Sequence, residues 1–199
     1  MINYIFGLPG SGKSTYLTYL ARREIKRINQ GKSKYNRVLC NFAVKGTYLI
    51  DFNDLGVYDT SDSLILIDEA TLCADSRDYK SFKRTTKNFI LLHRHYHSDI
   101  WIASQQYDGV DKKIRDTTAN MFYIKKVPFG LSYMVRIPMH ILVPEQTGEI
   151  IQGYKMPKIL ERLFTSFGAH KFIYRPKYYK YFDSYDAPFL PAKEFEYCE

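Results

Sequence analysis

Short apolar runs separated by polar or glycine-rich segments recur along the first 125 residues of the chain. Runs in which apolar and polar residues do not alternate are typical of strands buried on both faces of a sheet. The runs predicted as strands span residues 2–6, 37–42, 64–67, 99–104 and 120–125.

The segments between these runs carry helical signals. Residues 13–29 follow a glycine-rich turn and are predicted as a helix, and residues 111–118 as a short helix. Across residues 78–95, apolar side chains recur at helical spacing, at Phe82, Phe89, Leu92 and Tyr96. Residues 46–60 are rich in loop formers, with room for a small hairpin or a short helix. Alternating buried strands and helices predict an α/β fold with a mostly parallel sheet flanked by helices.

The pattern changes after residue 127. Residues 133–143 and 148–154 are predicted as antiparallel strands joined by a turn at 144–147, and residues 157–167 as a helix. From Arg175 onward the chain is rich in proline and tyrosine and has no clear period, which predicts an extended tail packed on the body or on a neighbouring subunit. We therefore expect a core at residues 1–127 and a C-terminal hairpin, helix and tail at residues 128–199.

A phosphate-binding loop follows the first predicted strand. Residues 7–14 read GLPGSGKS, which fits the G-x-x-x-x-G-K-[ST] pattern between a strand and a helix. Glycines let successive backbone N–H groups face a phosphate, and the helix N-terminus adds its positive end. Lys13 would reach the β- and γ-phosphates and the Ser14 hydroxyl would bind Mg²⁺. The residues predicted to bind the nucleotide are Gly7, Leu8, Pro9, Gly10, Ser11, Gly12, Lys13, Ser14 and Thr15.

Two acids close the apolar run at residues 64–67. In phosphate-loop enzymes a carboxylate at the end of a buried strand holds Mg²⁺, which assigns that role to Asp68. The adjacent Glu69 is placed to orient and polarise the attacking water. The Asp-Glu order, and a sequence without an Asn-Lys-x-Asp guanine reader, favour ATP over GTP. An extra predicted strand, residues 37–42, precedes Asp68 and indicates a P-loop NTPase of the additional-strand ATPase type rather than the kinase-like type.

Further candidates for catalysis lie beyond these acids. Gln105 follows the predicted strand at 99–104 and could contact the γ-phosphate or the attacking water, or be an ordinary polar loop residue. Oligomeric ATPases of this class take an arginine from a neighbouring subunit to neutralise transition-state charge. The candidates are Arg115, Arg94 and, with less support, Arg136, and the sequence does not choose among them.

Charge and aromatic content suggest a polyanionic partner. The formal net charge is +8, and 16% of the 199 residues are aromatic, including 18 tyrosines. Basic residues cluster after the phosphate loop, at Arg22, Arg23, Lys26, Arg27, Lys32, Lys34 and Arg37. This cluster is either a solvated surface or a contact surface for nucleic-acid phosphates. Tyrosines beside basic residues in the run 174–181 could stack on unpaired bases or pack on the body.

Cysteine usage and hydropathy bear on location. The chain has three cysteines, an odd count without paired metal-type spacing, which favours a reducing cytoplasm over a disulfide framework. Cys40 lies in an apolar run and is expected to be buried. No run approaches the roughly 18 apolar residues of a spanning helix, and the chain starts directly with a predicted strand. We expect any contact with a membrane to be peripheral or through a partner.

These residues resemble the zonular occludens toxin-like (Zot-like) family of phage assembly ATPases. The likeness covers about residues 1–125 and rests on the loop at 7–14, the acids at 68–69, the His-Arg-His segment at 93–95, and Gln105 followed by the Asp-Lys-x-Ile-Arg segment at 111–115. It implies an ATPase of the FtsK/HerA superfamily that works as a homo-oligomeric ring. It also implies movement of single-stranded viral DNA, rather than duplex, at an assembly site on the host inner membrane.

One departure from the family pattern affects the expected role. Family members usually continue into a membrane span and an outer domain, whereas this chain ends at Glu199. We therefore expect a stand-alone motor that packages or delivers DNA, with a viral assembly or capsid partner, more than a membrane-anchored extrusion machine.

Two other functions fit the same loop. A small-molecule kinase would use it to transfer phosphate to an acceptor, although Glu69 beside Asp68 suits water activation better. A nucleotide-switched assembly protein would bind ATP without turnover and use the tyrosine-rich tail for docking.

Overall fold

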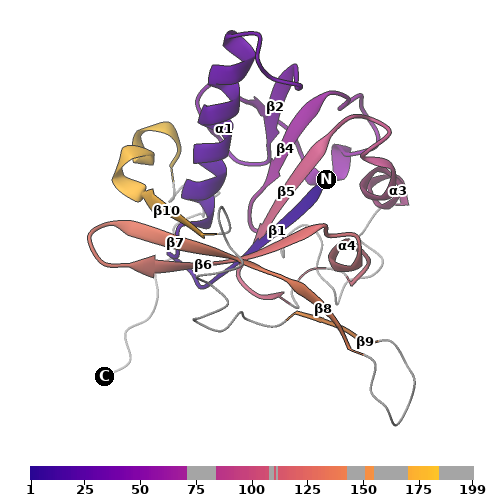
Figure 1. Cartoon of the computed structure of the whole chain (residues 1–199). Coiled ribbons are helices and arrows are strands. Elements are labelled where there is room, and N and C mark those ends of the chain that lie inside the picture. The colour runs from indigo at the N-terminus through magenta and orange to yellow at the C-terminus, as the bar shows by residue number, and fades with distance from the viewer. Residues whose placement is uncertain (71–83, 108–109, 111, 143–150, 155–169, 184–199) are drawn as a thin grey trace, which may run out of the picture.

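The computed structural model describes residues 1–70, 84–107, 110, 112–142, 151–154 and 170–183 (Figure 1). Within these residues, eight strands form one sheet in the order β10-β7-β6-β1-β5-β4-β2-β3. The strands are β1 Ile2–Phe6, β2 Arg37–Cys40, β3 Tyr48–Leu49, β4 Ser63–Ile67, β5 Asp99–Ser104, β6 Asn120–Val127, β7 Leu131–Ile137 and β10 His170–Tyr174. The segment from β6 to β3 is parallel, and β7 and β10 are antiparallel additions.

The predicted parallel sheet of an additional-strand P-loop NTPase is confirmed. The additional strand between β1 and β4 is β5, which pairs with both. The sequence prediction rested instead on the strand at 37–42, which forms β2 and pairs with the other edge of β4. The carboxyl ends of β1, β4 and β5 therefore lie at one edge of the sheet. Gly7, Asp68 and Gln105 each follow one of these ends, so the topology brings the main site candidates to the same edge.

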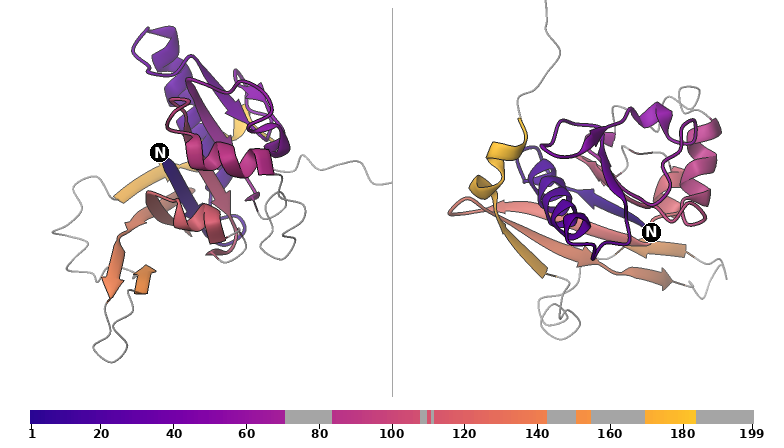
Figure 2. Two further views of the ribbon diagram at one scale, coloured as in Figure 1. Left: turned by 90° about the vertical axis from the view of Figure 1, so that its right-hand side faces the viewer. Right: turned by 90° about the horizontal axis from the view of Figure 1, so that it is seen from above.

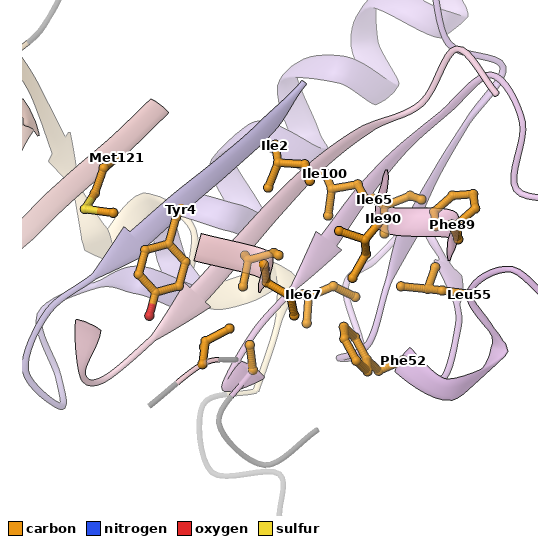
Figure 3. Packing of buried hydrophobic residues seen from close by; sticks show 14 of the residues in the cluster. Ile2, Tyr4, Phe52, Leu55, Ile65, Ile67, Phe89, Ile90, Ile100 and Met121 are labelled. Carbon is orange, nitrogen blue, oxygen red and sulfur yellow. The ribbon is translucent and has the colours of Figure 1, made fainter. Parts of the chain in front are cut away.

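Helices cover both faces of the sheet. Helix α1 Lys13–Asn29 packs on one face, and α3 Arg84–Leu92 and α4 Lys112–Asp116 on the other (Figures 1 and 2). A 3₁₀ turn, η1 Phe52–Asp54, follows β3. Figure 3 shows isoleucines from the sheet packed against η1 and α3, including Ile65 and Ile100 near Phe52 and Phe89. The expected buried Cys40 lies in the core beneath α1 and is fully buried.

The C-terminal hairpin differs from the sequence prediction. The predicted strand at 133–143 is two strands, β7 and β8 Met139–Leu142, divided at Pro138. Proline has no backbone N–H for a ladder, which favours a break at this position. β7 joins β6 through a turn at 128–130, and β8 pairs with β9 Ile151–Tyr154 in a separate hairpin that projects from the sheet (Figure 1). The predicted turn at 144–147 and helix at 157–167 lie outside the described residues.

Residues 174–183 form a strap across the phosphate-loop side of α1. The strap contains two 3₁₀ turns, η3 Arg175–Lys177 and η4 Tyr179–Tyr181, drawn in yellow beside α1 in Figure 1. The Arg175 backbone N–H donates to the Gly130 carbonyl over 2.9 Å, and that of Lys45 to the Tyr181 carbonyl over 3.0 Å. Tyr178 packs edge-on against Tyr19 of α1. The division at residue 127 stays a prediction, although β7 and β10 continue the sheet begun by the core.

Candidate nucleotide-binding site

The loop between β1 and α1 is shaped by its glycines. Gly10 and Gly12 have φ values of 69° and 101°, a backbone conformation that residues with a side chain rarely adopt. A Cβ atom on Gly7 would lie 2.2 Å from the Ile124 carbonyl oxygen of β6. Close approach to the sheet therefore requires glycine at position 7, and the positive φ values favour it at positions 10 and 12. Helix α1 begins with the Tyr16 N–H donating to the Gly12 carbonyl over 2.9 Å.

Lys13 and two residues from distant parts of the chain brace this loop. The Lys13 side chain is buried, and its Nζ donates to the Gly7 carbonyl at 3.0 Å and, more weakly, to the Leu8 carbonyl at 3.4 Å. Ser132 of β7 donates its hydroxyl to the Ser11 carbonyl at 2.6 Å. Arg175 of the strap donates Nη1 to the Gly10 carbonyl at 3.3 Å. Contacts from β7 and the strap thus fix the loop from outside the motif.

Asp68 lies buried directly after β4, beside the start of α1. The Ser14 side chain lies close enough to the Asp68 carboxyl to favour its charged form. Burial raises the pKa of the Asp68 carboxyl, and the neighbouring Ser14 side chain and the charge of Lys13 only partly oppose that shift. Asn41, after β2, fixes the backbone here through hydrogen bonds to the Asp68 N–H at 2.7 Å and carbonyl at 2.8 Å. A buried carboxylate next to a hydroxyl is a donor set that fits Mg²⁺, whose charge would offset the burial of Asp68.

Glu69 and Gln105 are brought together at the same edge. The Gln105 side-chain amide donates to the Glu69 carboxylate at 3.1 Å. Glu69 has a φ of 47°, an uncommon conformation for a residue with a side chain, of a kind that clusters at functional sites. The loop after β5 is held by Tyr4, whose hydroxyl donates to the Gln106 carbonyl at 2.9 Å; Figure 3 shows this hydroxyl pointing away from the neighbouring isoleucines. The amide contact fixes the orientation of the Glu69 carboxylate, a group that can serve as a general base toward water.

A cavity of about 600 Å³ lies over the phosphate loop. It is lined by Pro9, Gly10, Gly12, Lys13, Ser14, Thr15, Glu69, Arg175, Tyr179, Phe182 and Asp183. Most of the predicted phosphate-loop residues and Glu69 therefore face one cavity. Asp68 lies beneath it through its contact with Ser14, Ser11 is buried, and Leu8 is exposed.

The three candidate arginines do not line this cavity. The Arg115 guanidinium stacks over the Tyr107 ring at 4.7 Å from its centroid, on the face of the sheet that α4 covers. Arg94 follows α3, before the amino end of β5, and Arg136 is an exposed residue of β7. None of these three arginines therefore lies at the nucleotide cavity of its own subunit.

Sequence reasoning missed several residues of the site. Asn41 lies one residue before the end of the predicted strand at 37–42, and a polar residue near the end of an apolar run was the available signal. Ser132 and Arg175 contact the loop across 121 and 165 residues of chain, and no local pattern marks them. The charged residues of the tyrosine-rich tail that line the cavity, Arg175 and Asp183, are thus found only in the structure.

The sheet order, the loop at 7–14 and the acids after β4 define a P-loop NTPase fold of the additional-strand type. A family model described as zonular occludens toxin (Zot) matches residues 23–171. The chain belongs to the zonular occludens toxin family. The matched stretch includes Asp68, Glu69 and Gln105, but neither the phosphate loop nor Arg175.

Two solved structures are similar to this chain. The N-terminal domain of zonular occludens toxin from Neisseria meningitidis is 16% identical, with a TM-score of 0.57, and the match covers 92% of this chain and 98% of that one. The genome packaging NTPase B204 of Sulfolobus turreted icosahedral virus 2, in complex with ATP-gammaS, is 15% identical with a TM-score of 0.45, covering 64% and 75%. No curated protein matches the chain. In the described part of the chain, no helix has the length and apolar character needed to cross a membrane.

Proposed function

We propose that this protein is an ATP-hydrolysing motor that moves viral DNA during virion assembly. The observation that carries the proposal is the Glu69–Gln105 pair beside the Asp68–Ser14 pair at the mouth of the phosphate loop. One acid is buried against a hydroxyl and suits Mg²⁺, and the other faces the cavity and suits water. That division of roles is expected of hydrolysis rather than of nucleotide storage.

The proposed chemistry assigns one step to each residue. Backbone N–H groups of the loop and Lys13 bind the phosphates, and Ser14 with Asp68 would hold Mg²⁺. When bound, Mg²⁺ neutralises charge on the β- and γ-phosphates. Glu69 takes the proton of the attacking water, while Gln105 holds the Glu69 carboxylate in place.

A ring of identical subunits would complete the site. Because Arg94, Arg115 and Arg136 lie away from their own cavity, any of them that contacts the γ-phosphate must come from a neighbouring subunit. The proposed substrate is single-stranded phage DNA, packaged or extruded in the host cytoplasm. A viral assembly or capsid protein, or peripheral contact with the inner membrane, would position the ring.

A basic groove between α1 and the strap is the proposed DNA contact. Its cavity of about 490 Å³ is lined by residues that include Arg22, Arg23 and Lys26 of α1 with Lys177 and Tyr178 of the strap. Three residues of the basic cluster, Arg22, Arg23 and Lys26, thus meet the tyrosine-rich tail on one surface. Tyr178 is packed against Tyr19. We therefore expect the groove to bind DNA mainly through contacts with its phosphates and less through stacking of bases on Tyr178.

Lys26→Ala should weaken DNA binding and make it less salt-dependent. The loss of one phosphate contact is expected to reduce the slope of log affinity against log salt by about one. Lys125→Ala is the matched control, since it removes one exposed lysine from β6, away from the groove. Equal salt slopes for the two variants would contradict the proposed surface.

The decisive experiment measures ATP hydrolysis without DNA, with single-stranded DNA and with duplex DNA, together with the mass of the particle in solution. We expect a ring-sized particle whose hydrolysis is stimulated most by single-stranded DNA. Lys13→Ala should abolish turnover, because Lys13 is the buried cation of the loop. Hydrolysis indifferent to nucleic acid would overturn the motor. Phosphate transfer to a small acceptor would then support a kinase, and binding without turnover a nucleotide switch.

A further inference from the structure

We infer that the strap at residues 174–183 forms a wall of the nucleotide site, with Arg175 binding the phosphates and Tyr179 stacking on the base. This inference rests on the proposed function only in that it concerns the same nucleotide site. It assigns binding roles to residues that lie beyond the stretch matched by the family model, which ends at residue 171.

Arg175 lies directly against the phosphate loop. Its Nη1 donates to the Gly10 carbonyl at 3.3 Å, and its Cδ lies 3.1 Å from where a Cβ atom on Gly12 would be. Its Nε is buried and has no hydrogen-bond partner among the described residues. Arg175 also lines the cavity over the phosphate loop, so the guanidinium N–H groups at the end of its side chain are within reach of a phosphate bound there.

The Arg175 guanidinium adds a positive charge to the side of the cavity that the strap forms. Lys13 donates to the Gly7 and Leu8 carbonyls, and Glu69 adds a negative charge to the same cavity. Arginine offers five donors in a planar fork that matches phosphate oxygens, and only one of these donors contacts Gly10. Arg175 therefore provides a second fixed cation for a triphosphate, supplied by the same subunit.

Tyr179 provides an aromatic surface in the same cavity. It is 48% exposed, whereas its neighbours Tyr178 and Phe182 are packed against Tyr19 and Phe42. An exposed aromatic side chain beside a phosphate site can stack on a nucleobase, as aromatic side chains do in nucleic-acid complexes. Asp183 also lines the cavity, and its carboxylate can accept hydrogen bonds from ribose hydroxyl groups.

The strap is anchored on both sides of these residues, so the wall is preorganised. Before Arg175, β10 pairs with β7 along its length. After Tyr179, Val44 and Phe182 form an antiparallel bridge, and the Arg22 guanidinium lies 4.4 Å from the Tyr181 ring centroid. Ordering the wall therefore adds little entropic cost to nucleotide binding.

The test compares the affinities of ATP and AMP for the full chain and its variants, by equilibrium titration with Mg²⁺ present. Arg175→Ala should weaken ATP binding about tenfold or more, the loss expected for a charge-assisted contact, and AMP binding far less. Arg175→Gln keeps a donor for Gly10 without the charge and should show the same selective loss. Tyr179→Ala should weaken ATP and AMP by a similar factor, and Tyr179→Phe should restore both.

The control is Lys125→Ala, with thermal unfolding of every variant to confirm a folded chain. ATP affinity unchanged in both Arg175 variants, or an equal loss for AMP, would overturn the role of Arg175. Unchanged affinities in Tyr179→Ala would overturn the base contact. Nucleotide binding is measured here without DNA and without ATP turnover. These outcomes therefore do not depend on whether the proposed motor function is correct. A parent chain that binds no nucleotide would overturn both proposals.

Discussion

Glu69→Gln should reduce the turnover number for ATP about 10²–10⁴-fold while leaving ATP affinity close to that of the parent. The amide has nearly the size of the carboxylate and can still contact the Gln105 side chain, 3.1 Å away in the parent. It can no longer take a proton from water. The change therefore removes a step of the reaction and spares the phosphate loop.

The measurement is a steady-state rate together with an ATP titration on the same preparation. Gln105→Ala serves as the companion variant, because it removes the donor that holds Glu69 and leaves the proton acceptor. We expect it to lower turnover less than Glu69→Gln does, without changing the loop. A fall of less than about tenfold for Glu69→Gln would show that the general base, commonly worth 10²–10⁴-fold, lies elsewhere.

The local part of this site could be predicted from the sequence. The loop at 7–14 follows an apolar strand and precedes a helix, and the acids at 68–69 end another strand, so residue type and position together indicated the chemistry. Parallel strands place their carboxyl ends at one edge, which is why Glu69 and Gln105 meet across 36 residues of chain. The sequence placed both residues after buried strands, but their hydrogen bond to each other is found only in the structure.

The order of strands was less accessible, because it depends on contacts between distant residues. The apolar runs predicted β1, β2, β4, β5 and β6, yet nothing in any single run shows that β5 lies between β1 and β4. Two residues could have corrected the predicted hairpin. Pro138 marks the break between β7 and β8, and Gly130, with a φ of 71°, marks the turn at 128–130. Together they let β7 return along β6 and reach the phosphate loop.

The strap contacts could not be predicted from local patterns. Arg175 is one basic residue among many in a tyrosine-rich tail, and its position over Gly10 depends on β10 pairing with β7. Packing of the tail on the body was expected as a general feature, but its place over the nucleotide cavity was not. The contacts that the strap makes with the site are therefore set by tertiary structure rather than by the motif.

Gly12→Ala should destabilise the chain by about 2–5 kcal/mol and abolish nucleotide binding, the combined cost of backbone strain and overpacking. Gly12 has a φ of 101°, and a Cβ atom there would lie 2.2 Å from the Ser132 hydroxyl oxygen. That hydroxyl holds the Ser11 carbonyl at 2.6 Å, so it cannot move away without releasing the loop. The measurement is urea unfolding, followed by the fluorescence of Trp101, the single tryptophan of the chain.

Gly10→Ala separates the two costs. Gly10 also has a positive φ, 69°, but a Cβ atom there would meet nothing within 4 Å, so only the strain of about 1–2 kcal/mol is expected. Adding Ser132→Gly to Gly12→Ala should recover the packing part of the loss and leave the strain. If Gly12→Ala were no more destabilising than Gly10→Ala, the contact between β7 and the phosphate loop would not constrain the site. A larger loss that Ser132→Gly partly relieves would show that a strand beyond residue 127 shapes the loop that binds the phosphates.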